Sequence, residues 1–85
     1  MTSMAIDYDK LPEHIRPGFQ EYIEHRIQPG GFIMAVLCNN LVESFGRADE
    51  INQGRLFDIV SFLYNEAPSI CWGSQEKVEA WLAEG

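Results

Sequence analysis

Apolar residues recur near the start of the chain at the three- and four-residue spacing of an amphipathic helix. One such face is formed by Ile15, Phe19, Tyr22, Ile23 and Ile27. Because the Pro17-Gly18 pair interrupts this pattern, we expect a short turn over 12–16 and then a helix over 17–27. A Pro-Gly-Gly breaker follows, and a second helix is predicted over about 31–38.

Two asparagines separate this second helix from a third. Asn39 and Asn40 can end one helix and cap the next, because asparagine tolerates left-handed backbone geometry and its side chain accepts hydrogen bonds from exposed N–H groups. The third helix is expected over about 40–45, with Gly46 ending it. Its apolar residues are Leu41, Val42 and Phe45.

The longest helix is predicted over about 50–65, with Asp49 as its N-cap. Its apolar residues wrap beyond a single stripe, so we expect it to be central and to be contacted on several sides. They are Ile51, Phe57, Ile59, Val60, Phe62, Leu63 and Tyr64. A loop over 68–73 and an N-cap at Ser74 lead into a last helix over 75–83.

These elements predict an all-α fold, in which four to five short helices form a compact bundle around the segment 50–65. The first ten residues, 1–10, are expected to be a flexible N-terminus, and 11–85 a single helical domain. The run 57–64 has the residue types of a strand, but no second strand is predicted that could pair with it.

Composition narrows the class of protein. With 46% hydrophobic and 12% aromatic residues, the 85-residue chain has enough apolar material for a core and for an apolar surface that binds a partner or a second copy. Thirteen acidic and six basic residues give a formal charge of −7. This balance argues against direct nucleic-acid binding, which needs lysine and arginine, and favours a basic partner.

The sequence also argues against a membrane protein and against catalysis. The longest apolar run, 32–38, is far too short to span a bilayer, and no signal peptide is recognised, so we expect a cytoplasmic protein with two free thiols. The residues that could bind zinc are scattered singly rather than in close pairs. They are His14, His25, Cys38 and Cys71. We therefore predict no metal, no cofactor and no enzymatic activity.

A polar cluster is the strongest candidate for a site. Arg47, with Asp49 two residues on, is either an ion pair that pins a tight connection or part of a recognition site for a carboxylate or phosphate. Trp72 in its loop either covers the core or anchors a partner, and an aromatic such as Tyr64 could stack on a base. The candidate partner- or ligand-binding residues are Arg47, Asp49, Asn52, Trp72, Asn39, Asn40 and Tyr64.

Several strings resemble a family of small bacteriophage and prophage proteins of uncharacterised function. They are Pro29-Gly30-Gly31-Phe32, Ala35-Val36-Leu37, Gly46-Arg47-Ala48-Asp49, Tyr64-Asn65-Glu66-Ala67-Pro68 and Trp72-Gly73-Ser74. The likeness runs from about Leu11 to Leu82, although the family usually has Asn-Asp-Leu at 39–41 and no proline at position 17. It implies a phage accessory gene whose product acts in the host bacterial cytoplasm.

Two hypotheses for function follow. The leading one is a small non-enzymatic phage accessory protein that binds and modulates a host protein, for example one involved in defence. The alternative is an oligomeric small-molecule binder that sequesters a nucleotide or signalling molecule. A flat apolar patch with an acidic rim would favour the protein partner. A concave pocket, or one built across the interface of a homodimer, would favour the small molecule.

Overall fold

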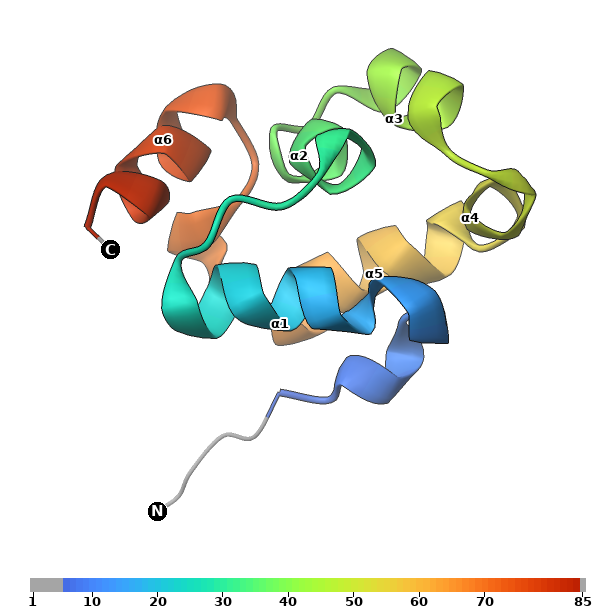
Figure 1. Ribbon diagram of the computed structural model, residues 1–85, viewed down its shortest axis with the longest axis horizontal. Coiled ribbons are helices and arrows are strands. Elements are labelled where there is room, and N and C mark those ends of the chain that lie inside the picture. The colour runs from blue at the N-terminus through green and yellow to red at the C-terminus, as the bar shows by residue number, and fades with distance from the viewer. Residues whose placement is uncertain (1–5, 85) are drawn as a thin grey trace.

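The computed structural model describes residues 6–84, which fold into short helices joined by tight connections (Figure 1). The α-helices are α1 (Arg16–His25), α2 (Gly31–Leu37), α3 (Leu41–Arg47), α4 (Glu50–Gly54), α5 (Leu56–Glu66) and α6 (Gln75–Ala83). The 3-10 helices are η1 (Tyr8–Lys10), η2 (Glu13–Ile15) and η3 (Ser69–Cys71). No strand occurs within residues 6–84, and the all-α prediction is confirmed.

The core lies where α1, α2 and α5 meet, with α6 and η3 at one end and α3 and α4 at the other (Figure 1). Phe62 of α5 is at its centre. It meets Phe19 of α1 edge-on, with 5.7 Å between ring centroids, and Tyr8 of η1 at 5.6 Å. Gly18 brings α1 and α2 close together, since a Cβ there would lie 2.6 Å from Ile33. The buried apolar residues are Leu11, Ile15, Phe19, Tyr22, Ile23, Ile33, Ala35, Val36, Leu37, Ile59, Phe62, Leu63, Cys71 and Val78.

The predicted asparagine turn between the second and third helices is confirmed. Asn39 has a φ of 62°, and its N–H donates to the carbonyl of Val36, while the N–H of Asn40 donates to that of Ala35. This pair of bonds is a Schellman motif, which satisfies the last carbonyls of α2. The Asn40 side chain then accepts a hydrogen bond from the N–H of Glu43 and caps α3.

Other predicted boundaries hold to within a few residues. Pro17 lies in the first turn of α1, and Ser74 and Asp49 cap α6 and α4 with their side chains, as expected. The first helix, however, ends at His25 rather than Ile27, because Arg26 takes the left-handed conformation. Gly46 does not end the third helix, which continues to Arg47.

The physical reason for this longer α3 is an ion pair one turn apart. Arg47 and Glu43 are 2.7 Å apart in an i,i+4 pair, and this contact stabilises the last turn. The helix ends where Ala48 becomes extended.

The predicted central helix over 50–65 is wrong in two respects. First, it is two helices, because Arg55 leaves helical geometry between α4 and α5, just after Gly54, and glycine is less favourable to a helix than any residue except proline. The Arg55 side chain holds the break by donating to Asp58 at 2.6 Å and to the carbonyl of Lys10 at 3.2 Å. Second, the segment is contacted by η1, α1 and α2, as expected for a central element, but one of its sides is left open to solvent. Its exposed apolar residues are Ile51, Phe57, Val60 and Tyr64.

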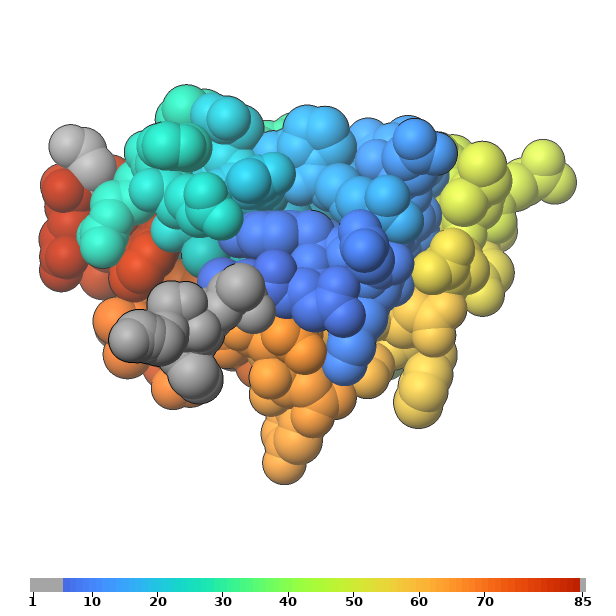
Figure 2. Space-filling model, turned by 90° about the horizontal axis from the view of Figure 1, so that it is seen from below, coloured from blue at the N-terminus to red at the C-terminus, as the bar shows by residue number. Residues whose placement is uncertain are grey.

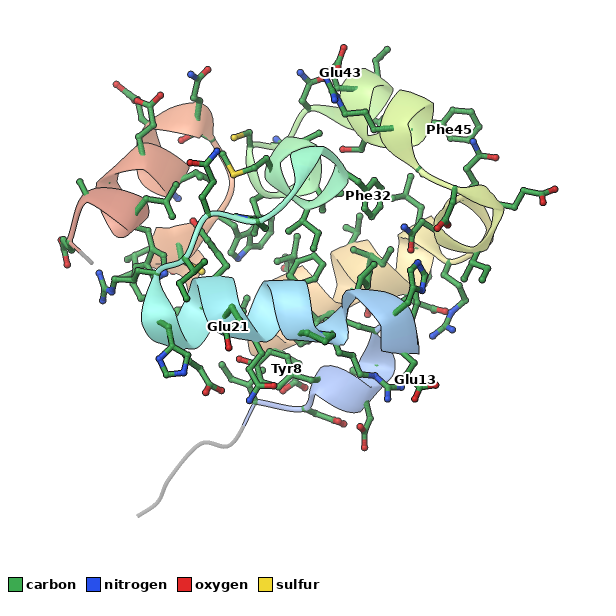
Figure 3. All side chains as sticks on the ribbon, viewed as in Figure 1. Tyr8, Glu13, Glu21, Phe32, Glu43 and Phe45 are labelled. Carbon is green, nitrogen blue, oxygen red and sulfur yellow. The ribbon has the colours of Figure 1, made fainter. Side chains whose placement is uncertain are left out.

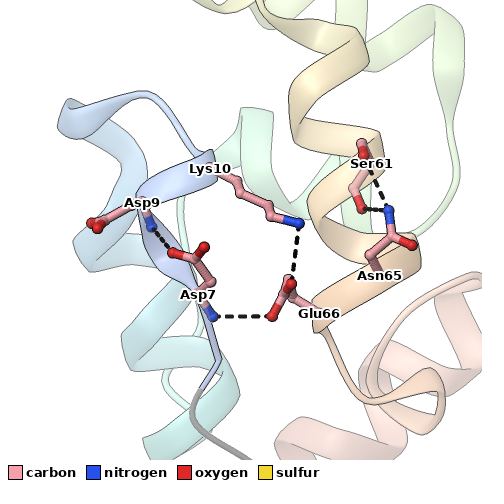
Figure 4. A network of polar contacts seen from close by, with 6 residues as sticks. All are labelled: Asp7, Asp9, Lys10, Ser61, Asn65 and Glu66. Atoms are coloured by element: carbon pink, nitrogen blue, oxygen red, sulfur yellow. Dashed lines mark hydrogen bonds and ion pairs between the residues drawn. The ribbon is translucent and has the colours of Figure 1, made fainter.

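The N-terminal segment also differs from the prediction of a flexible tail over 1–10. Residues 1–5 lie outside the described residues, but residues 6–10 pack against α5 (Figure 4). The carboxylate of Glu66 accepts a hydrogen bond from the N–H of Asp7 at 3.1 Å and pairs with Lys10 at 3.2 Å. The bond from Asp7 and the pairing with Lys10 hold the pKa of Glu66 below its ordinary value. Tyr8 then adds its ring to the core.

Tyr22 and Arg26, near the end of α1, attach the C-terminal part of the chain. The buried Tyr22 hydroxyl donates to the carbonyl of Cys71 at 2.6 Å, and the Tyr22 carbonyl accepts from the Trp81 indole at 2.9 Å. Arg26 lies 3.8 Å over the Trp81 ring and bonds to Glu84 at 3.0 Å. A cation over an aromatic face is attractive, so this contact offsets the strain of a positive φ at Arg26.

Replacing Tyr22 by phenylalanine tests the first of these bonds. The Tyr22→Phe variant leaves the buried carbonyl of Cys71 without its donor, so we expect the free energy of unfolding to fall by about 1–3 kcal/mol. Chemical denaturation followed by circular dichroism measures this change. Tyr64→Phe removes the same atom from an exposed tyrosine and serves as the control. Equal stability of the two variants would contradict the role given to the Tyr22 hydroxyl.

Candidate functional site

Arg47 and Asp49 face different partners. Within residues 6–84, Arg47 pairs with Glu43 and not with Asp49. Asp49 accepts a hydrogen bond from the N–H of Asn52 at 2.8 Å and lies 3.2 Å from the His14 ring. Asp49 therefore ties the connection between α3 and α4 to η2, while the Arg47 guanidinium stays half exposed on the surface. The predicted cluster is thus divided between two sides of α3 and α4.

Asn52 and Trp72 lie at least partly inside the protein rather than on its surface. Asn52 is buried, with no partner for its carbonyl oxygen among the described residues. Trp72 is half-buried and packs against the core, and its indole N–H is likewise without a partner there. This position agrees with the interpretation of Trp72 as a cover for the core. Tyr64 is exposed on α5, far along the chain from Arg47.

Arg47 and Asn40 line an open depression of about 390 Å³ at the start of α2. Gln28 and Gln75 add polar groups from distant parts of the chain, and Met34 and Cys38 contribute apolar ones. The Arg47 side chain lies directly over Gly31, where a Cβ would be 2.9 Å from its Nη1. A side chain at position 31 would therefore require the flexible Arg47 side chain to shift. The sequence did not reveal the two glutamines, because nothing local connects them with Arg47.

The α3 helix presents its apolar residues to solvent and buries a polar one. Leu41, Val42 and Phe45 are 68%, 82% and 55% exposed, whereas Ser44 is 3% exposed. The Ser44 hydroxyl donates to the carbonyl of Asn40 at 2.6 Å, so its burial against α2 leaves no polar atom unpaired. Phe45 and Glu43 both point away from the molecule (Figure 3). Contiguous exposed apolar side chains are a common feature of protein-binding surfaces, so this side of α3 is a candidate for one.

The two cysteines are free thiols in a poor environment for nucleophilic chemistry. Burial raises the pKa of Cys71 from 9.0 to about 11, and burial followed by the charge of Glu79 raises that of Cys38. Because the thiolate is the reactive form, both groups are held in their unreactive state near neutral pH. In the part of the chain that the structure describes, no three His, Cys, Asp or Glu residues gather as metal ligands would.

Comparison with known proteins adds no relative. Neither the models of known protein families, nor the curated proteins, nor the solved structures match the chain. The resemblance to phage proteins therefore stays a prediction from the residues. Among residues 6–84, no helix has the length and apolar character needed to cross a bilayer.

The raised pKa of Cys71 predicts a loss of stability in alkali. The unfolded thiol ionises near its ordinary value and the folded one near pH 11, so the folded state binds this proton more tightly. The contribution of this proton to the free energy of unfolding is complete below about pH 9 and is lost as the pH rises through 11. We expect the free energy of unfolding of a Cys71→Ala variant to fall less steeply between pH 9 and 11. Parallel slopes for the two proteins, in urea titrations at each pH, would contradict this assignment.

Proposed function

We propose that this chain is a small non-enzymatic phage accessory protein that binds a host protein and modulates it. The observation that carries the proposal is the orientation of α3, which directs Leu41, Val42 and Phe45 outward while a serine fills the inner position. The phage origin rests on the resemblance in sequence. The raised pKa values of both thiols support a binding role over nucleophilic catalysis.

The chemistry around α3 indicates the kind of partner. Apolar side chains at positions i, i+1 and i+4 of a short helix fit a partner with an apolar groove. The carboxylates of Glu43 and Asp49, although they contact Arg47 and His14, remain more than half exposed beside them, on a chain with a formal charge of −7. A groove edged with lysine or arginine would complement this rim and speed association. We therefore propose a host protein with an apolar groove and a basic edge.

Val42 offers a direct test, because it is the most exposed apolar residue of α3. We expect Val42→Glu to keep the fold and to lower retention of the partner by about tenfold or more, since a buried carboxylate would replace an apolar anchor. Tagged protein is incubated with bacterial lysate, and the retained proteins are quantified by mass spectrometry. Ile70→Glu introduces the same charge at an exposed apolar residue of η3 and is the matched control.

The proposal requires a protein that the wild type and Ile70→Glu retain and Val42→Glu does not. If every retained protein is held equally by all three, or if the wild type retains none, the α3 proposal is wrong.

A second candidate is capture of a small polar molecule, and the depression beside Arg47 favours it. Its polar lining combines the Arg47 guanidinium, which is paired with the Glu43 carboxylate at 2.7 Å, with the side chains of Asn40, Gln28 and Gln75, which suit a polar base edge. This candidate predicts that native mass spectrometry of the undenatured protein finds a retained small molecule that Arg47→Ala loses. A wild-type mass equal to that of the polypeptide alone, even after incubation with mixed nucleotides, would dismiss it.

A further inference from the structure

The α5 helix has a second apolar face that the fold does not use. Ile59, Phe62 and Leu63 point into the core, but Phe57 and Tyr64 are 84% and 80% exposed on the opposite side. Side chains of this helix, gold to orange, project from the molecular surface as separate knobs (Figure 2). We propose that this outer face of α5 binds the same face of a second copy, so that the protein is a homodimer with antiparallel α5 helices at its centre.

The spacing of the residues makes the face complementary to itself. One helical stripe is formed by Phe57, by Val60 and Ser61 three and four residues later, and by Tyr64 four and three residues after those two. Their order is large, small, small, large, and its midpoint lies between Val60 and Ser61. A two-fold axis through that midpoint places Phe57 of each copy against Tyr64 of the other, and Val60 against Ser61. The small central pair lets the helices approach, and the aromatic pairs close both ends.

The charge distribution is compatible with a second copy as the occupant of this face. Each copy carries a formal charge of −7, so two copies repel each other least where the contact surface is free of carboxylates. The stripe itself contains no charged residue. The neighbouring acids of α5 are already paired, Asp58 with Arg55 at 2.6 Å and Glu66 with Lys10 at 3.2 Å. The groove proposed as the partner of α3 has a basic edge, and this stripe offers no carboxylate to pair with it. The two faces therefore suit different partners.

The size of the face fits the same occupant. A fully exposed aromatic side chain presents roughly 200 Å², so Phe57 and Tyr64 alone present roughly 300 Å² of apolar surface. Val60 lies beside them in a small notch that Leu41 and Leu56 also line, so the apolar surface continues onto α3. With Ser61 and Asn65, which are bonded to each other at 3.1 Å (Figure 4), the face approaches the roughly 600 Å² per partner of the smallest specific interfaces.

The oligomeric state gives the first test. By light scattering after size exclusion, and by native mass spectrometry, we expect a mass about twice the 9.7 kDa of the chain. Val60→Glu places two carboxylates at the axis and should raise the dissociation constant at least about a hundredfold, as should Tyr64→Glu, whose exposed position keeps the fold intact. Ile70→Glu carries the same charge on another exposed residue and should remain dimeric.

Disulfide trapping tests the antiparallel geometry. Under mild oxidation, Val60→Cys should form a covalent dimer, because the axis brings the two copies of this residue together. Phe57→Cys alone should not, since its two copies lie about two helical turns, roughly 10 Å, apart along the helix direction, beyond the reach of a disulfide. A mixture of Phe57→Cys and Tyr64→Cys should form the mixed dimer. The wild type, with Cys38 and Cys71, gives the background.

The outcomes separate this inference from the proposed function. A monomeric wild type at up to millimolar concentration, a dimer that survives Val60→Glu, or self-trapping of Phe57→Cys would each overturn the antiparallel α5 dimer. Val42→Glu should keep the dimer while losing the host protein, so failure of one proposal leaves the other standing. A dimer lost in Val42→Glu but kept in Val60→Glu would move the self-association to α3 and refute the inference.

Discussion

The buried tyrosine on α1 holds the two halves of this small domain together. Its hydroxyl reaches the carbonyl of Cys71 in η3, and its own carbonyl receives the indole N–H of Trp81 in α6. Both polar groups of Tyr22 are thus satisfied inside the core, where an unpaired one would be strongly unfavourable. Within the described residues, the chain from η3 onward has no strand or disulfide to attach it, so these two bonds and the Arg26–Trp81 contact position it together with the bond from the Gly73 N–H to the Leu37 carbonyl and the burial of Val78.

The remaining core is small and one-sided. The aromatic contacts of Phe62 with Phe19 and Tyr8 join α5, α1 and η1, and α2 covers them from the opposite side. A domain of this size buries a limited fraction of its surface, yet α3 and α5 leave large apolar side chains outside. The fold therefore leaves in solvent apolar side chains whose burial would have added to its stability. This is the physical basis for assigning binding to the outer faces of both helices.

Local signals in the sequence predicted the helices and their caps well. The Asn39-Asn40 turn, the Asp49 and Ser74 caps and the apolar stripe of α1 depend on interactions within a few residues, and each is confirmed. Cap geometry is decided by the adjacent N–H groups, so it can be inferred without knowing the fold.

Burial could not be inferred in the same way. Leu41, Ser44 and Phe45 share one side of a seven-residue helix, and only the orientation set by the turn at Asn39 decides that the serine faces α2. The break at Arg55 depends on its bond to the distant carbonyl of Lys10, which no local pattern contains. The polar lining of the depression could not be predicted for the same reason, because Gln28 and Gln75 are far from Arg47 in the sequence.

The serine inside α3 has a consequence for how this molecule can change over generations. Because Ser44 and the Asn40 cap hold the helix in place, the outward side chains of α3 take almost no part in folding stability. Under the proposed function, exchanging them would alter what the surface recognises while the scaffold stays intact. Recognition and foldability would then be encoded by different residues of the same seven-residue helix, so a lineage could follow a changing target by replacing three side chains.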